Sequence, residues 1–127
     1  MASGGRFRIL HCEFCEDGTT GGSHQALVDC VRLVDRQRFE PVVVFYQGNR
    51  FVEPLRELGI TVHAWDRERR IEKQPHEQGR RLGKIASTIG ALRRRRQLLR
   101  AERIDLVHLN NTPSLGFDDW LPMARSL

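Results

Sequence analysis

The chain has 127 residues, of which 39% are hydrophobic and 29% charged, and its formal net charge is +5 at pH 7. This length suits one domain with a real hydrophobic core, and the composition excludes disorder of the whole chain. No apolar run approaches the roughly 20 residues of a membrane-spanning helix, and residues 1–6 do not resemble a signal peptide. We therefore expect a cytoplasmic protein, and the three cysteines fit a reducing compartment better than a disulfide framework.

The chain opens with an apolar strand, a glycine-rich loop and an amphipathic helix. The strand is predicted over residues 7–12, and the helix from Ser23 to about Arg36. Gly21 and Gly22 directly precede the helix, where backbone N–H groups can bind a phosphate that no Cβ atom obstructs. The loop has neither G-x-G-x-x-G nor the P-loop Gly-Lys-Ser/Thr, so an ordinary glycine-rich turn is the alternative interpretation.

The three cysteines lie in and before this helix. Cys12 and Cys15 form a C-x-x-C pair, which can serve as a redox dithiol or as half of a zinc site. A zinc site needs two more ligands, and a redox dithiol usually begins the helix, which Cys15 does not. We therefore expect no metal site. Cys30 is predicted to act as a small hydrophobic residue on the buried helix face. That face is predicted to comprise Ala26, Leu27, Cys30, Val31 and Val34.

Two more strands and a short helix follow. Residues 42–46 are a continuous β-branched and aromatic run, which is typical of a parallel strand buried on both faces. Asn49 is placed to cap a short helix, and Gly59 to end it. The buried side of that helix is predicted to comprise Phe51, Val52, Leu55 and Leu58. Residues 60–65 predict a third strand, and the alternation predicts an α/β, doubly wound parallel sheet.

Segment 67–103 is strongly basic. It holds 13 of the 21 Lys and Arg and 4 of the 16 Asp and Glu, so its net charge is 13 minus 4, or +9. A helix is predicted from about Gly79, and Arg96 is predicted to lie on its apolar stripe with the guanidinium reaching water. The stripe comprises Leu82, Ile85, Ile89, Leu92 and Leu99.

The other arginines of this helix are candidates for binding an anionic surface, namely Arg93, Arg94, Arg95 and Arg100. Three interpretations stay open: a solvated helix face, an anionic membrane surface, and a nucleic-acid contact. Nucleic acid is the least favoured, because no nucleic-acid-binding motif accompanies the basic segment.

A fourth strand, residues 106–109, ends in the polar turn Asn110, Asn111 and Thr112. The carboxyl ends of parallel strands meet at one edge, so this turn and the Gly21–Gly22 loop should flank one crevice. Amides and hydroxyls suit a hydroxyl-rich ligand such as a sugar, although they can also simply form the turn and cap a following helix. His108 lies inside the apolar run and is predicted to be a packed core residue.

Several segments, in this order and spacing, resemble the N-terminal, acceptor-side domain of family 4 glycosyltransferases. These are retaining enzymes in which two Rossmann-like domains face each other across a cleft. The matching segments are residues 9–11, 21–27, 39–44, 58–60 and 104–111. The resemblance extends over residues 8–127 and implies a partial Rossmann-like sheet of about four strands.

The resemblance implies transfer of a sugar from a nucleotide-sugar donor to a saccharide or lipid-linked acceptor, with no cofactor besides the donor substrate. Gly21 and Gly22, followed by Ser23, match positions near the donor diphosphate in that family. The turn residues 110–112 match a polar cluster after the fourth strand. His24 stands where many members have Glu, so no role carries over to it.

The donor-binding domain of that family has no counterpart in these 127 residues. We therefore expect an N-terminal glycosyltransferase fragment that is inactive alone, and that can associate peripherally with the inner membrane face. The alternative is a non-catalytic Rossmann-like binding or assembly module, which docks a partner through its basic helix and open sheet edge.

Overall fold

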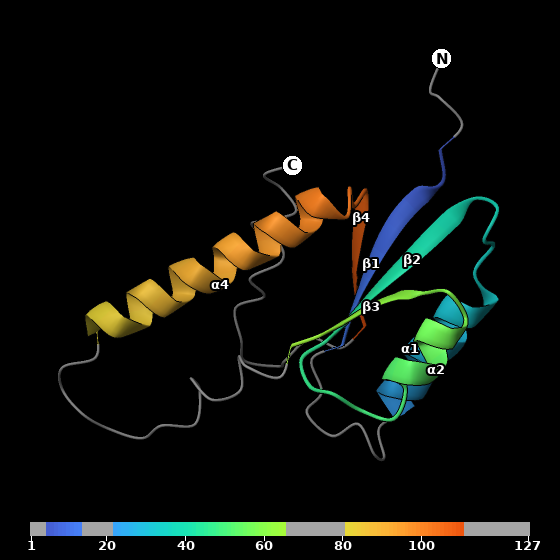
Figure 1. The fold of residues 1–127 in the computed structure, drawn as a ribbon, viewed down its shortest axis with the longest axis horizontal. Helices are drawn as coiled ribbons and strands as arrows, with labels where there is room; N and C mark the ends of the chain where they lie inside the picture. Colours follow the sequence, from blue (N-terminus) through green and yellow to red (C-terminus); the bar gives the residue numbers. More distant parts are fainter. Residues whose placement is uncertain (1–4, 14–21, 66–80, 111–127) are drawn as a thin grey trace.

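The computed structural model describes residues 5–13, 22–65 and 81–110, with side chains from Ile89 onward in the last range. Strands and helices alternate in these parts of the chain, as predicted (Figure 1). In chain order the elements are β1 (Phe7–Glu13), α1 (Gly22–Leu33), β2 (Phe39–Phe45), α2 (Val52–Glu57), β3 (Thr61–Ala64), α4 (Arg81–Ala101) and β4 (Leu106–Leu109).

The strands form one parallel sheet in the order β3-β2-β1-β4. The chain moves from β1 to β2 and β3 on one side of β1, and then returns to place β4 on the other side. Helices α1 and α2 lie on one face of this sheet, and α4 lies on the other (Figure 1). The predicted α/β class and partial Rossmann-like fold are therefore confirmed.

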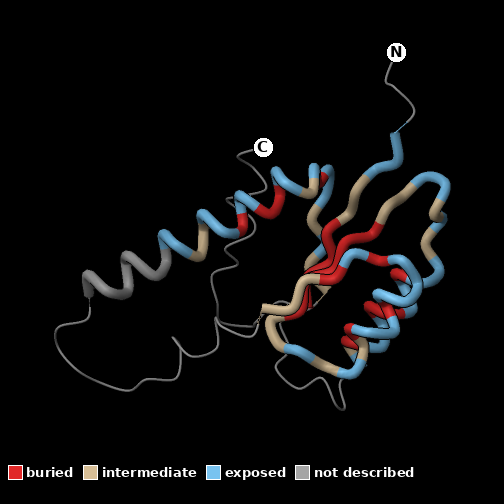
Figure 2. The backbone as a smooth tube through the Cα atoms, in the orientation of Figure 1, coloured by how far each residue is buried: buried red, intermediate tan, exposed pale blue. Residues whose placement is uncertain are grey.

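The core has two layers because helices cover both faces of the sheet. Val43 and Phe45 pack with α1 and α2, whereas Val42 and Val44 pack with the C-terminal part of α4. Successive side chains of a strand point to opposite faces, so the continuous apolar run of β2 fills both layers. Figure 2 shows the buried segments concentrated in the inner strands and on the sides of α1 and α2 that face them.

The predicted ends of α2 are only partly correct. Asn49 lies before the helix rather than at its cap: its Oδ1 accepts the Phe51 N–H at 2.9 Å and holds the preceding turn. Gly59 does end the helix, because its φ of +72° is a left-handed conformation that few other residues adopt readily. Leu58 was predicted to be buried but is 53% exposed.

The predicted buried face of α1 is displaced around the helix. The buried residues are His24, Leu27, Val28 and Val31. Ala26 and Cys30 are exposed, so the prediction that Cys30 packs in the core is wrong. Apolar spacing gave the width of the stripe, but contact with β2 and α2 decided which residues face inward.

Strand β4 is an edge strand within the described residues, since it pairs with β1 alone. Its side chains are consequently less buried than the sequence predicted. Leu106 is 54% exposed, and His108 is exposed rather than packed in the core. An apolar run reports strand propensity, but burial depends on what covers each face of the strand.

Candidate functional site

The strand order creates a topological switch point between β1 and β4. The chain leaves β1 in one direction toward β2, and β4 is added in the opposite direction. In open parallel sheets, ligands bind outside the carboxyl ends of the two strands at such a point, because their connections diverge there and leave a crevice. The candidate site is therefore formed by the end of β1, the start of α1 and the end of β4.

Asn110, the first residue after β4, holds these three elements together. Its backbone N–H donates to the Cys12 carbonyl of β1 at 3.0 Å. Its side-chain Nδ2 donates to Glu13 Oε2 at 2.6 Å and to the Ser23 carbonyl of α1 at 2.7 Å. The sequence predicted that the polar turn and the glycine loop would flank one crevice. Of these segments, the described residues Asn110 and Ser23 are in direct contact.

Glu13 is the residue of this group that the sequence analysis missed. It ends β1, one residue beyond the predicted strand, and its side chain is fully buried. A carboxylate only accepts hydrogen bonds, and the Asn110 amide satisfies part of that capacity. The sequence signal that could have identified it is an acidic residue directly after the predicted strand, at the carboxyl end where ligands bind in such sheets.

The chemical character of the site follows from these groups. The Glu13 carboxylate and the Ser23 carbonyl both accept hydrogen bonds from the Asn110 amide. Glu13 is fully buried, so it positions Asn110 and is not exposed to a ligand. Asn110 and Ser23 are partly exposed and can contact a ligand that has hydrogen-bonding groups.

Of the predicted glycine loop, Gly22 is described and begins α1. It is exposed, and a Cβ atom built at this position would meet none of the described residues within 4 Å. The described part of the structure therefore does not require glycine there. Gly21, Asn111, Thr112 and Cys15 lie outside the described residues.

A histidine pair, His11 and His108, lies on the same sheet face as Glu13. The two residues are register partners on β1 and β4, and their Nδ1 atoms are 3.0 Å apart. Their rings are perpendicular, with centroids 5.1 Å apart. Burial, reinforced by the nearby His108, lowers the pKa of His11 from 6.5 to about 4. Sequence could not reveal this pair, because it depends on the register between strands 97 residues apart.

His24 is buried and packs in the core, so its side chain is not accessible to a ligand. Its ring is fully enclosed and stacks on Phe45 and Phe51, with centroids 5.8 Å and 5.9 Å away. Its Nδ1 has no hydrogen-bond partner among the described residues. His24 is thus part of the apolar layer beneath α1.

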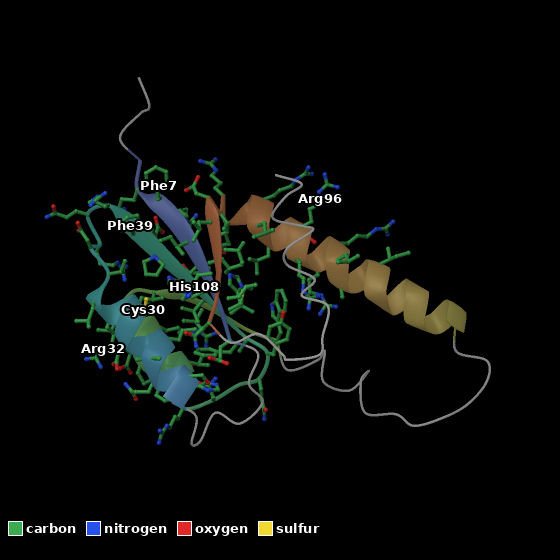
Figure 3. The ribbon with its side chains drawn as sticks, turned by 180° about the vertical axis from the view of Figure 1, so that it is seen from behind. Phe7, Cys30, Arg32, Phe39, Arg96 and His108 are labelled. Atoms are coloured by element: carbon green, nitrogen blue, oxygen red, sulfur yellow. The ribbon has the colours of Figure 1, made fainter. Side chains whose placement is uncertain are left out.

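The basic surface of α4 differs from the prediction at two positions. Arg93, Arg94 and Arg100 are exposed, as the prediction that they contact an anionic partner surface requires. Arg95 is 5% exposed, with its guanidinium over the Tyr46 and Trp65 rings, so its assignment to that surface is wrong. Arg96, which was predicted to lie on the apolar stripe, is exposed instead. The side chains are drawn in Figure 3.

Two further structural findings bear on function. Within the described parts of the chain, no three His, Cys, Asp or Glu residues group in a way that could hold a metal ion. None of the described helices combines the length and apolar character that crossing a bilayer requires.

Comparison with known proteins returned no match to a protein-family model, to a curated protein or to a solved structure.

Proposed function

We propose that this chain is the acceptor-side domain of a glycosyltransferase that moves a sugar from a nucleotide-sugar donor to a saccharide or lipid-linked acceptor. The observation that carries the proposal is the convergence of Glu13, Ser23 and Asn110 at the switch point. The sequence resemblance to family 4 glycosyltransferases supports it independently.

The two halves of the site suit two parts of a nucleotide-sugar reaction. The partly exposed Asn110 side chain, which Glu13 holds in place, can hydrogen-bond to sugar hydroxyls. The start of α1 at Gly22 offers backbone N–H groups and the positive end of the helix dipole to a diphosphate. In this arrangement the sugar hydroxyls lie nearer to Glu13 than the phosphates do.

We propose that the 127 residues alone do not transfer sugar. Fixing donor and acceptor in the reacting geometry can contribute about 7–11 kcal/mol to lowering a barrier. The proposed contacts at Gly22, Ser23 and Asn110 all lie on one side of a bound ligand, and a second surface is needed to hold the nucleotide. Binding by this chain should therefore be weak, with turnover at the background rate.

Nuclear magnetic resonance titration of the 127-residue chain tests this proposal. Nucleoside diphosphate sugars should shift the resonances of Gly22, Ser23 and Asn110, and the free monosaccharides should shift mainly Asn110. Asn110→Ala should abolish these shifts. Gln37→Ala should preserve them, because Gln37 is exposed and precedes β2, at the amino ends of the strands. Circular dichroism checks that each variant is folded.

Gly22→Val provides a second test, because a Cβ atom added there meets none of the described residues within 4 Å. It should leave the fold intact and selectively weaken diphosphate-containing ligands, while free monosaccharides still bind. Ligand-induced shifts that cluster away from the switch point, or sugar transfer by the 127 residues alone, would overturn the proposal.

A second candidate function, a non-catalytic module that docks on an anionic membrane surface, is favoured by one observation. The exposed residues Arg93, Arg96 and Arg100 are spaced by three and four residues on α4 and therefore share one helix face. Basic residues near an anionic membrane contribute about 1 kcal/mol each. The three arginines together would strengthen binding by about 3 kcal/mol, or about 100-fold.

Vesicle sedimentation tests the second candidate. The chain should bind anionic but not neutral vesicles, and less so at high salt. Replacing Arg93, Arg96 and Arg100 by Gln should abolish binding. A control with the same loss of charge replaces exposed arginines away from α4, namely Arg32, Arg38 and Arg50. Equal effects of the two triple variants, or equal binding to neutral vesicles, would contradict a specific surface.

A further inference from the structure

The histidine pair joins the edge strand β4 to the central strand β1. A hydrogen bond between two imidazole nitrogens needs a hydrogen on one ring and a lone pair on the other. The 3.0 Å contact between His11 Nδ1 and His108 Nδ1 is therefore compatible with two neutral rings or with one cation. It is incompatible with two cations, because two N–H groups and two positive charges would then face each other.

The surroundings of the pair determine the pH at which both rings carry protons. His11 is 3% exposed and His108 is exposed. Double protonation of the pair requires a proton on His11, and burial lowers the pKa of that ring to about 4. The pair consequently stays intact at neutral and mildly acidic pH, and it becomes doubly charged only in stronger acid.

Among the described residues, few other charged or titratable groups lie on this face of the sheet. β1 contributes Glu13, which accepts the Asn110 amide, and α1 contributes the buried His24. The neighbouring residues from β2 and α2 are apolar, namely Val43, Phe45, Val52 and Leu55. At the start of β4, the Asp105 carboxylate accepts the Arg8 backbone N–H at 2.8 Å, at the opposite end of the strand from the crevice.

We propose that double protonation of the histidine pair detaches the carboxyl end of β4 from β1 and so releases Asn110 from Glu13 and Ser23 at the switch point. β4 has four residues and, in the described part of the chain, pairs with β1 alone. Asn110 lies two residues beyond His108, and its side-chain hydrogen bonds go to Glu13 and Ser23. Separation of the rings therefore moves the residue that connects the three elements of the crevice.

The inference goes beyond the proposed function, since it concerns how β4 and Asn110 are held at the switch point and not what binds there. Its test accordingly uses no ligand. The 127-residue chain, labelled with ¹⁵N, is titrated from pH 7.5 to 3.5 while the Asn110 side-chain amide and the β4 backbone amides are followed. Far-ultraviolet circular dichroism over the same range reports global unfolding.

We expect the Asn110 and β4 resonances to change with a midpoint near pH 4, where His11 becomes protonated, before the circular dichroism changes. His11→Phe keeps an aromatic ring that cannot be protonated, and should abolish this transition. It leaves Glu13 and Asp105 in place, so it separates the histidine effect from that of the carboxylates. His108→Asn, at the exposed position, removes the second charge without disturbing the core and should also abolish the transition.

His63→Gln is the matched control, because His63 contacts Glu102 on the other face of the sheet. This variant should retain the transition at Asn110. Loss of the transition in His63→Gln, an unchanged transition in both His11→Phe and His108→Asn, or coincident local and global unfolding would each overturn the proposal.

Discussion

Arg95 offers the sharpest test of how α4 is held on the sheet. Its guanidinium lies 5.7 Å from the Tyr46 ring centroid and 5.8 Å from that of Trp65. Its Nη2 donates to the Tyr46 hydroxyl at 3.1 Å. Tyr46 follows β2 and Trp65 follows β3, so a single arginine connects α4 to the carboxyl ends of two strands. We predict that Arg95→Ala destabilises the fold and that Arg96→Ala does not.

The magnitude follows from the groups that Arg95→Ala removes. The buried stem contains methylenes that contribute about 0.8 kcal/mol each, or about 2 kcal/mol together. A hydrogen bond from a charged donor contributes about 1.5–3 kcal/mol, and a desolvated cation–π contact up to about 2 kcal/mol. These losses are partly offset, because the wild-type fold bears a cost of several kcal/mol for desolvating the guanidinium, and Arg95→Ala removes that cost. The net expected loss is about 2–3 kcal/mol, against less than about 0.5 kcal/mol for the exposed Arg96.

Urea unfolding, followed by circular dichroism and tryptophan fluorescence, measures both variants. Arg95→Ala should lower the urea midpoint without changing the slope of free energy against denaturant, which would indicate a change in stability alone. The fluorescence of folded Arg95→Ala should also differ from the wild type, because Trp65 loses its cationic neighbour. Equal midpoints for Arg95→Ala and Arg96→Ala would refute the reasoning.

Three further predictions concern stability. The unfolded chain takes up a proton at His11 between pH 6.5 and about 4 that the folded chain does not, so the free energy of unfolding should fall across this window as the pH falls. Urea titrations at several pH values should show that the free energy of unfolding falls by up to about 3 kcal/mol as the pH falls, and that His11→Phe lacks this decrease. Gly59→Ala should lower the free energy of unfolding by about 1 kcal/mol, because Gly59 has a left-handed φ. Gly90→Ala, in open space within α4, should raise it by up to about 1 kcal/mol. Thermal unfolding measures both variants. Leu27→Ala, at a fully buried position, should cost about 2–5 kcal/mol, and Leu33→Ala, at 84% exposure, should have little effect on the urea midpoint.

The strands and their order along the chain were accessible from sequence because their signals are local. The run over residues 42–46 predicted a strand buried on both faces, and β2 has that environment. Gly59 predicted the end of α2 because a helix commonly ends at a residue with a left-handed backbone conformation, which glycine adopts readily. Asn110 was predicted to lie in a turn after β4, because strand and turn signals depend on neighbouring residues.

Which face of an element points inward was less accessible. On α1 and α4 the apolar spacing was compatible with more than one rotation, and it favoured Cys30 and Arg96 where Val28 and Arg95 are buried. Cysteine fits a core or a surface, and a long arginine stem can cover apolar area while its head pairs with aromatic rings. Contact with the sheet selected one rotation from these alternatives.

The sequence by itself therefore determined the α/β class, the parallel sheet and the presence of polar groups at one of its edges. Only the tertiary structure decided that Glu13, Ser23 and Asn110 bond to one another, and that His11 faces His108. The physical reason is that a strand's local pattern specifies its own alternation, whereas its partner and register depend on packing between segments far apart in the chain.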